Sequence, residues 1–401
     1  MNAVSLADIE EAARLLDGVA IRTPMDGARW LSERCGGEVR LKCENLQRTG
    51  SFKMRGAYTR ISRLSEEERA RGVVAASAGN HAQGVALSAK LLGVKATVYM
   101  PEGAPIPKIN ATMGYGADVV FHGQYLHHAM VAAREFEAET GAVLIHPYDH
   151  VDIVTGQGTC GLEILEQSPE VRTVLVPTGG GGLLAGVAIA IKSKRPDIRV
   201  IGVQAAGAAA YPPSLAGGSP VQLEKMTTMA DGIAVGRPGD ITFAIVQQYV
   251  DEIVTVSEES MSRALLAVAE RAKMIVEPSG AAAVAAIMDD PSAYETPSVA
   301  VLSGGNVDPL LLGKVIQHGM AAAGRFLYLR VVISDLPGGL AGLLADVGAA
   351  GASVIEVAHE RISPNLHLNE VEVSLQLETR SAQHAERVSA MLAEKGYRVD
   401  V

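Results

Sequence analysis

Short hydrophobic runs alternate along the chain with longer amphipathic stretches. From residue 70 onward, runs rich in valine and isoleucine recur and are short enough to be buried strands. The predicted strands are 73–77, 96–100, 118–122, 143–146, 173–177, 200–204, 253–256 and 299–303. Helical periodicity marks the stretches between them, such as 82–92, 129–140 and 260–273. This alternation predicts an α/β fold in which helices cover both faces of parallel sheets.

The pattern changes after about Gly324. Strands are predicted at 327–334, 353–361, 370–377 and from 397, with helices at 340–350 and 382–395. This βαββαβ order is typical of a ferredoxin-like unit. We therefore expect a large domain over 1–323, containing a smaller subdomain at roughly 45–150, and a second domain over 324–401.

Helix signals support this segmentation at two places. The first 16 residues predict an amphipathic helix capped near Ser5. Ser65 and Glu68 form the pattern of a capping box before the helix that leads into the strand at 73.

Composition and charge exclude several classes of protein. Hydrophobic residues make up 48% and charged residues 20%, as in ordinary globular proteins. A net charge of -10 disfavours nucleic acid as a partner. Apolar runs such as 183–191 are shorter than the roughly 20 residues that span a membrane, and no signal peptide is evident. The three cysteines have no CxxC spacing, so we expect a cytoplasmic protein without a disulfide framework or zinc site.

One lysine stands in a distinctive segment, GSFKMRGA at residues 50–57. Phe52 precedes Lys53, and small residues that favour a helix start follow it. A surface lysine near a helix start is the ordinary interpretation of such a segment. Two further motifs favour a functional role.

The first of these motifs is a run of four glycines between a predicted strand and an apolar helix. It comprises Gly179, Gly180, Gly181 and Gly182, followed by Leu183. Free backbone amides at a helix N-terminus can close around a phosphate. The segment lacks the Gly-Lys-Ser/Thr of a P-loop and a convincing dinucleotide-binding pattern. A flexible turn is the alternative, although four glycines cost more conformational entropy than a turn requires.

The second motif also joins a strand to a helix. It comprises Ser77, Ala78, Gly79, Asn80 and His81. Small residues here expose N–H groups that can hold a carboxylate, and Asn80 can donate to a phenolate oxygen; as an alternative, Asn80 caps the helix. Ser303 ends the last strand of the large domain, where a hydroxyl can meet a ring nitrogen.

Together these motifs resemble the fold-type II family of pyridoxal phosphate (PLP) enzymes over essentially the first 320 residues. The resemblance implies that Lys53 forms a Schiff base with pyridoxal 5'-phosphate and that Phe52 lies beside it. It implies that Gly179, Gly180, Gly181, Gly182 and Leu183 bind the cofactor phosphate. It also implies that Ser77, Ala78, Gly79, Asn80 and His81 bind the substrate carboxylate, that Asn80 binds the cofactor phenolate, and that Ser303 binds the pyridine nitrogen.

Within that family the chain is similar to the threonine dehydratases, also called threonine ammonia-lyases. The similarity is carried by the stretch from ENLQ at 44–47 through Ala57, and by GQGT at 156–159, ADGIAV at 230–235 and EPSGA at 277–281. It implies elimination of water from L-threonine to give 2-oxobutanoate and ammonia, with L-serine giving pyruvate as a side activity. The amine of Lys53 would remove the Cα proton. Related racemases place an acidic metal ligand where this chain has Gln204, so no metal is expected.

The C-terminal segment DLPGGL at 335–340, through Glu356, resembles an ACT domain, a ligand-sensing module. The resemblance implies an amino-acid effector near the turn at 335–340 and an allosteric enzyme in isoleucine biosynthesis or threonine breakdown. A purely structural dimerisation domain is the alternative. Both imply a homo-oligomer, a dimer or tetramer, because edge strands of such domains commonly pair across subunits.

Three other functions compete with the dehydratase. Serine racemase, which also dehydrates serine, resembles this chain but carries a second serine where this chain has Ala78. A non-catalytic amino-acid sensor would not need Lys53. A cysteine or threonine synthase would use activated substrates. Glu277 either lies near the cofactor ring or caps a helix, and the sequence favours neither.

Overall fold

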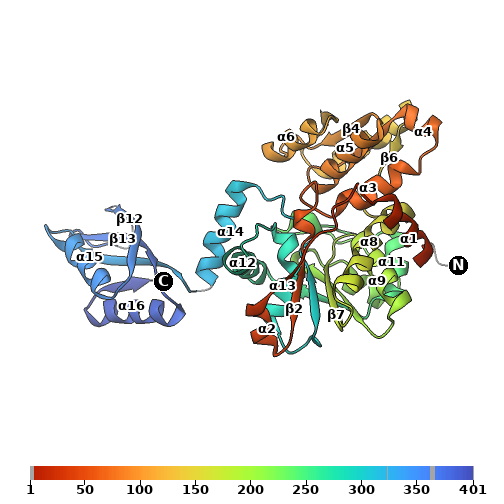
Figure 1. The fold of residues 1–401 in the computed structure, drawn as a ribbon. Coiled ribbons are helices and arrows are strands. Elements are labelled where there is room, and N and C mark those ends of the chain that lie inside the picture. Colours follow the sequence, from red (N-terminus) through yellow and green to blue (C-terminus); the bar gives the residue numbers. More distant parts are fainter. Residues whose placement is uncertain (1–3, 323, 362–365, 401) are drawn as a thin grey trace. The chain divides into compact units, whose positions relative to one another are not determined.

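The computed structural model describes residues 4–322, 324–361 and 366–400. The chain divides into two compact units, Met1–Leu312 and Gly313–Val401. The first unit contains two sheets and the second unit contains one (Figure 1). The predicted boundary between 323 and 324 stays a prediction, and residue 323 lies outside the described residues.

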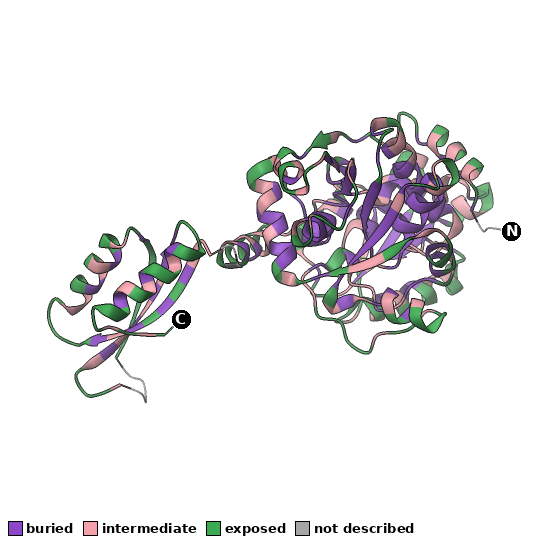
Figure 2. Cartoon of the chain, turned by 90° about the horizontal axis from the view of Figure 1, so that it is seen from below, coloured by how far each residue is buried: buried purple, intermediate pink, exposed green. Residues whose placement is uncertain are grey.

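The larger sheet of the first unit has six strands in the order β1-β2-β10-β7-β8-β9. Their bounds are β1 Met25–Gly27, β2 Val39–Lys42, β7 Thr173–Pro177, β8 Arg199–Ala205, β9 Glu252–Val256 and β10 Ser298–Val301. All neighbours are parallel except β1 and β2, which are antiparallel. The strands and the helices packed on them form the buried interior of this unit (Figure 2).

Helices that pack on the larger sheet include one that is apolar all round. These helices are α8 Val151–Gln167, α9 Gly182–Lys194, α11 Asp240–Tyr249 and α13 Pro278–Asp289, and α12 Glu258–Ala267 packs against α13. Every residue of α9 from Gly182 to Ile191 is buried, as expected of a helix without a polar face. It approaches α8 closely, because a Cβ on Gly186 would lie 2.5 Å from the amide nitrogen of Gly158. Glycine is therefore required where the two helices cross.

The smaller sheet has four parallel strands in the order β5-β4-β3-β6. Its elements are α3 Lys53–Ser62, α4 Glu66–Arg71, β3 Val73–Ala76, α5 Asn80–Leu92, β4 Ala96–Met100, α6 Ile106–Gly114, β5 Asp118–Phe121, α7 Leu126–Thr140 and β6 Val143–Leu144. Alternate residues of β3 enter different cores: Val73 and Ala75 pack in one, and Val74 and Ala76 in the other. Both faces of the strand are buried, which explains its continuous apolar run.

The second unit is an antiparallel sheet with two helices. Its elements are β11 Phe326–Ser334, α15 Gly339–Ala349, β12 Ser353–Glu360, β13 Glu370–Glu378, α16 Ala382–Glu394 and β14 Arg398–Asp400. The strand order β12-β13-β11-β14 is that of the ferredoxin-like split unit, as predicted. Alternate residues of β11 from Leu327 to Ile333 are buried with residues of both helices, including Leu343 and Leu392.

The predicted α/β class is confirmed, and the predicted strands are all present within one or two residues. Both capping signals are also present: Ser5 caps α1 (Leu6–Leu15) and Ser65 caps α4. The remaining elements are α2 Arg29–Cys35, α10 Tyr211–Gly217, α14 Pro309–Ala322, short turns at Glu44–Leu46, Ala206–Ala208 and Asp231–Ile233, and a π-helical turn at Val268–Ala272. The predicted alternation begins at residue 70, so it did not include β1 and β2, which precede that residue. In the part of the chain that the structure describes, no helix has the length and apolar character needed to cross a membrane.

Candidate active site

Lys53 lies at the start of α3, close to the end of β10. The preceding residues pair with the segment that follows this strand: Ser51 forms an isolated bridge with Gly304, and the amide of Phe52 donates to the carbonyl of Ser303 at 3.3 Å. Ser303 itself is buried, with 4% of its surface exposed. Two residues far apart in the sequence, Lys53 and Ser303, are thus brought to one edge of the larger sheet.

The amine of Lys53 is poorly solvated. Its Nζ donates to the carbonyl of Pro147 at 2.8 Å and lies 5.2 Å from the centre of the Phe52 ring. Desolvation lowers the pKa of Lys53 to about 8, and the negative charge of Glu277 partly opposes this shift. Burial, with a contribution from the charge of Lys53, also lowers the pKa of His81 to about 3. A neutral imidazole therefore accompanies an amine that can lose its proton near neutral pH.

We expect the reactivity of this amine to follow a titration near pH 8. Only the neutral amine can attack an aldehyde, so PLP should combine with the apoenzyme faster as pH rises and reach a plateau above about pH 8. An ordinary lysine would not reach a plateau until about pH 10.4. Because the charge of Glu277 raises the pKa of Lys53, Glu277→Gln should move the midpoint to lower pH. The measurement is the rate of absorbance change on mixing, and a midpoint near pH 10 in the unaltered chain would contradict the expectation.

A buried ion network fixes the helix that carries Lys53. The guanidinium of Arg55 is 1% exposed and lies 2.8 Å from Glu44 and 2.7 Å from Glu163. Glu163 also accepts from the buried ammonium of Lys42 at 2.5 Å. The two cations and two carboxylates balance in charge, which burial demands. The network ties α3 to β2 and α8, so the backbone position of Lys53 is set by three elements.

The glycine segment after β7 forms a concave turn of unused amides. Within the described residues, no hydrogen bond is donated by the backbone amides from Gly179 to Leu183. Gly181 has φ of +97° and a Cβ there would lie 1.9 Å from the hydroxyl oxygen of Tyr211. A Cβ on Gly180 would lie 2.4 Å from the ring of Tyr148. A side chain at Gly180 or Gly181 would therefore clash with a tyrosine. The backbone amides of the segment remain free to bind an anion at the N-terminus of α9.

The segment from Ser77 to His81 joins β3 to α5. The amide of Gly79 donates to the hydroxyl of Ser77 at 3.1 Å, whereas no donation from the amides of Asn80 and His81 occurs among the described residues. The ring of His81 is held by a 2.7 Å hydrogen bond from its Nε2 to the carbonyl of Ile145. Gly79 occupies the N-cap position, so Asn80 is the first helical residue and not the cap. These free amides at a helix N-terminus can receive a carboxylate.

Glu277 joins this cluster through its side chain. It occupies the N-cap position of α13, but its side chain accepts no capping hydrogen bond. Its Oε1 accepts from the amide of Asn80 at 2.6 Å, and the Oδ1 of Asn80 accepts from Asn306 at 2.8 Å. Desolvation and the charge of Asp231 raise the pKa of Glu277 to about 7. Of the two interpretations of Glu277, the geometry therefore favours the one at the site.

These residues fit PLP. The cofactor needs an amine for its aldehyde, donors for its phosphate and a polar partner for its ring. Lys53 provides a poorly solvated amine, the unused amides from Gly179 to Leu183 provide the donors, and Ser303 provides a buried hydroxyl in the segment that pairs with Phe52. Glu277 also has an oxygen, Oε2, that is buried without a partner among the described residues. An unpaired buried acceptor is expected where a ligand completes the site.

The fold and the site thus define a PLP-dependent enzyme. The pyridoxal-phosphate dependent enzyme family matches residues 16–304, and the chain belongs to this family.

Relatives narrow the class to lyases that act on amino acids. The L-threonine ammonia-lyase of Thermotoga maritima is 45% identical over 99% of this chain and 99% of its own length. The solved threonine deaminase isoform 2 of Solanum lycopersicum has a TM-score of 0.76 and 40% identity, covering 79% of this chain and 87% of that one. Maize serine racemase has a TM-score of 0.75 and 36% identity, covering 78% of this chain and 96% of that one. The predicted family and cofactor are confirmed.

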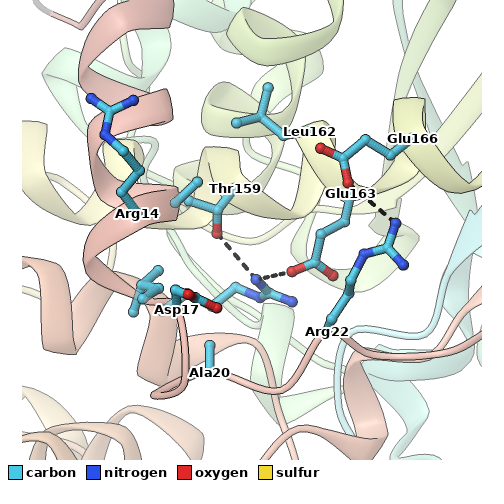
Figure 3. Close-up of a pocket in the computed structure, with 11 residues that line it drawn as sticks. Arg14, Asp17, Ala20, Arg22, Thr159, Leu162, Glu163 and Glu166 are labelled. Carbon is cyan, nitrogen blue, oxygen red and sulfur yellow. Dashed lines mark hydrogen bonds and ion pairs between the residues drawn. The ribbon is translucent and has the colours of Figure 1, made fainter.

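A separate cavity of about 440 Å³ lies between α1 and α8 (Figure 3). Its lining includes Arg14, Asp17, Arg22, Glu163 and Glu166. It borders the buried ion network described above, because Arg55 and its hydrogen-bond partners Thr159 and Glu163 line it. The three arginines and three carboxylates along it cancel in charge, so it does not select an anion or a cation.

The sequence did not reveal some residues of the site. Pro147 and Tyr148 lie in the loop before α8 and belong to no motif. The carbonyl of Pro147 accepts a hydrogen bond from the amine of Lys53, and the ring of Tyr148 lies against Gly180. Lys108 on α6 also lies close to the site, 2.6 Å from Asp231. Nothing in the sequence distinguishes Lys108 from the other lysines.

Proposed function

We propose that this chain is a threonine ammonia-lyase that eliminates water from L-threonine to give 2-oxobutanoate and ammonia, with L-serine giving pyruvate more slowly. The proposal is carried by the relation to an L-threonine ammonia-lyase along essentially the whole chain. PLP, when bound, supplies the electron sink for the carbanion that forms at Cα.

Lys53 is the residue that moves the proton in this proposal. Its amine, with a pKa of about 8, is partly neutral near pH 7 and can take the Cα proton of the substrate. The amides of Asn80 and His81 bind the substrate carboxylate, and this orients Cα toward Lys53. Loss of the β-hydroxyl as water and hydrolysis of the released enamine then give 2-oxobutanoate and ammonia.

Three further groups orient the cofactor. The amides from Gly179 to Leu183 would hold its phosphate, and the side-chain amide of Asn80 would donate to its phenolate oxygen. Ser303 would meet the ring nitrogen with a neutral hydroxyl. Such a hydroxyl would not favour a protonated ring, and this would favour prompt loss of the β-hydroxyl over transamination.

The resemblance to serine racemase makes racemisation the second candidate. Racemisation needs an acid or base on each face of Cα. Lys53 serves one face, and the position that carries a second serine in racemases is Ala78, whose methyl group transfers no proton. One-sided proton removal is therefore favoured, and elimination is the outcome.

The test is a direct assay of the purified chain with PLP. We expect ammonia and 2-oxobutanoate in equal amounts from L-threonine, at a higher kcat/KM than pyruvate from L-serine. Formation of D-serine at a comparable rate would favour the racemase. Reaction only with activated O-phospho or O-acyl substrates would favour a synthase, and a colourless protein that borohydride does not inactivate would indicate a sensor.

The second unit is proposed to be a regulatory ACT domain in a homo-oligomer. A cavity of about 340 Å³ lies in this unit at the turn after β11. It is lined by Ser334, Asp335, Leu336, Gly338, Leu340, His359 and Arg361, among others. Arg361 and Asp335 pair at 2.9 Å beside apolar Leu336 and Leu340, a combination that suits the charged groups and side chain of an amino acid.

Deleting the residues after Gly324 should leave turnover of L-threonine intact and abolish any response to isoleucine or valine. A point variant tests the same cavity in the full chain: Arg361→Ala should weaken the response. Arg398→Ala is the matched control, because Arg398 pairs with Glu370 at 3.2 Å and does not line the cavity. Initial rates at several effector concentrations are the measurement, and an unchanged response in the truncated chain would rule out this role.

A further inference from the structure

A buried lysine faces the segment that receives the substrate carboxylate. Lys108, on α6, has a side chain that is 9% exposed. Its ammonium lies 3.8 Å from the position that a Cβ on Gly79 would occupy, so it borders the turn between Ser77 and His81. No motif pointed to this residue, and the functions proposed above do not use it.

The ammonium of Lys108 has N–H donors that no acceptor among the described residues uses. It donates to the Oδ2 of Asp231 at 2.6 Å, and among the described residues no other acceptor receives a hydrogen bond from it. An ammonium carries three N–H donors, and leaving buried donors without acceptors is costly. A second anion beside Gly79 would remove this cost.

Asp231 fixes the direction of that ammonium. Asp231 is exposed, and the next residue, Gly232, packs against Glu277 so closely that a Cβ there would lie 3.1 Å from Oε1. Glu277 accepts from Asn80, which is adjacent to Gly79. Two pairs, Lys108 with Asp231 and Asn80 with Glu277, thus join residues of α5 and α6, which belong to the smaller sheet, to residues outside it, and Gly232 lies against the second pair.

We propose that Lys108 binds the substrate carboxylate together with the amides of the Ser77–His81 segment, and that Asp231 is the positioning residue that holds the Lys108 ammonium in place. The inference deepens the proposed function and rests on it. A substrate carboxylate at the turn would complete the donors of Lys108 and add a charge-assisted bond to the amide contacts. The enzyme would then select amino acids with a free carboxylate over their amides or esters.

Lys108→Met tests this in the holoenzyme. The variant keeps the length and apolar stem of the side chain and removes the charge. Loss of a charge-assisted hydrogen bond should raise KM for L-threonine about tenfold to a hundredfold, with a smaller change in kcat. The ratio of kcat/KM for L-threonine to that for L-threoninamide should fall by a similar factor, because the amide has no charge to lose. Asp231→Asn should shift both quantities in the same direction by a smaller factor.

Lys192→Met is the matched control. Lys192 also forms a tight pair with an aspartate, 2.7 Å from Asp251, but it lies on α9 away from the turn. This control should change neither KM nor the acid-to-amide ratio. If Lys108→Met leaves the ratio unchanged, or weakens the acid and the amide equally, Lys108 only holds the fold and the proposal is overturned.

A binding titration separates this inference from the proposed function. The cofactor absorbance of the holoenzyme reports L-threonine binding whether or not turnover follows. If the unaltered enzyme binds L-threonine without releasing ammonia, the proposed function fails. A Kd that is still at least tenfold higher in Lys108→Met would then support the carboxylate contact, and an unchanged Kd would refute it.

Discussion

Replacing Lys53 by alanine should reduce ammonia release from L-threonine by at least about a thousandfold, because general-base catalysis alone contributes about 10² to 10⁴ in rate. The amine also forms the covalent link to the cofactor, so the loss should lie at the upper end of that range. The nearby amine of Lys108 pairs with Asp231 at 2.6 Å beside the carboxylate-binding turn, so it is not placed to replace the lost base. Alanine removes the group without adding volume, so the fold should remain intact.

Three measurements make this expectation specific. Borohydride treatment followed by denaturation should leave the cofactor attached to the unaltered chain and release it from Lys53→Ala. Lys53→Arg should be equally inactive, since a guanidinium does not deprotonate at these pH values. Lys192→Ala, which removes an ammonium distant from the cluster, should keep full activity. Retention of even a tenth of the rate in Lys53→Ala would mean that another group is the base.

Hydrophobic patterning predicted strands most directly where both faces of the strand are buried. The strand at Val73–Ala76 is an example: its residues enter two different cores, so none of them can be polar and the run stands out in the sequence. The antiparallel β1, with exposed or half-buried residues, has no such requirement and was not recognised. Patterning from residue 70 onward thus recovers the smaller sheet, the sheet of the second unit and strands β7 to β10 of the larger sheet, whereas β1 and β2 precede that region.

The residues of the candidate site also fall into those that the sequence could predict and those that it could not. Lys53, the glycines and Asn80 could be predicted because each belongs to a segment whose backbone must take one shape. Lys108 and Pro147 could not, because their role depends on elements that meet only after folding: α6 meets the turn at Asp231, and the loop before α8 meets the start of α3. The sequence around a single lysine or a single backbone carbonyl does not indicate which distant element it will contact.

Gly181→Ala should cause the loss of cofactor binding and a marked loss of stability. Two independent effects add: the φ of +97° is a conformation that costs alanine about 1–2 kcal/mol, and the new Cβ would lie 1.9 Å from the hydroxyl oxygen of Tyr211. Tyr211 is fully buried, so it cannot turn away without disturbing the core. Overpacking of this kind costs about 1–3 kcal/mol. Moving the turn by enough to relieve the contact would separate its amides from the phosphate, and the Kd for PLP should rise at least about tenfold.

The two effects can be separated by a second substitution. Tyr211→Phe removes the oxygen at 1.9 Å, and the next ring atom lies 3.0 Å from the position of the added Cβ, so the double variant should recover part of the lost stability and cofactor affinity. The remainder reports the backbone strain together with the contacts that stay close, 3.0 Å to the Tyr211 ring and 3.1 Å to the Cβ of Thr242. Gly217→Ala is the control, since its Cβ would meet nothing within 4 Å and its φ is not left-handed. Thermal unfolding and fluorescence titration with PLP are the measurements. Equal behaviour of Gly181→Ala and Gly217→Ala would show that the glycine turn is not constrained as described.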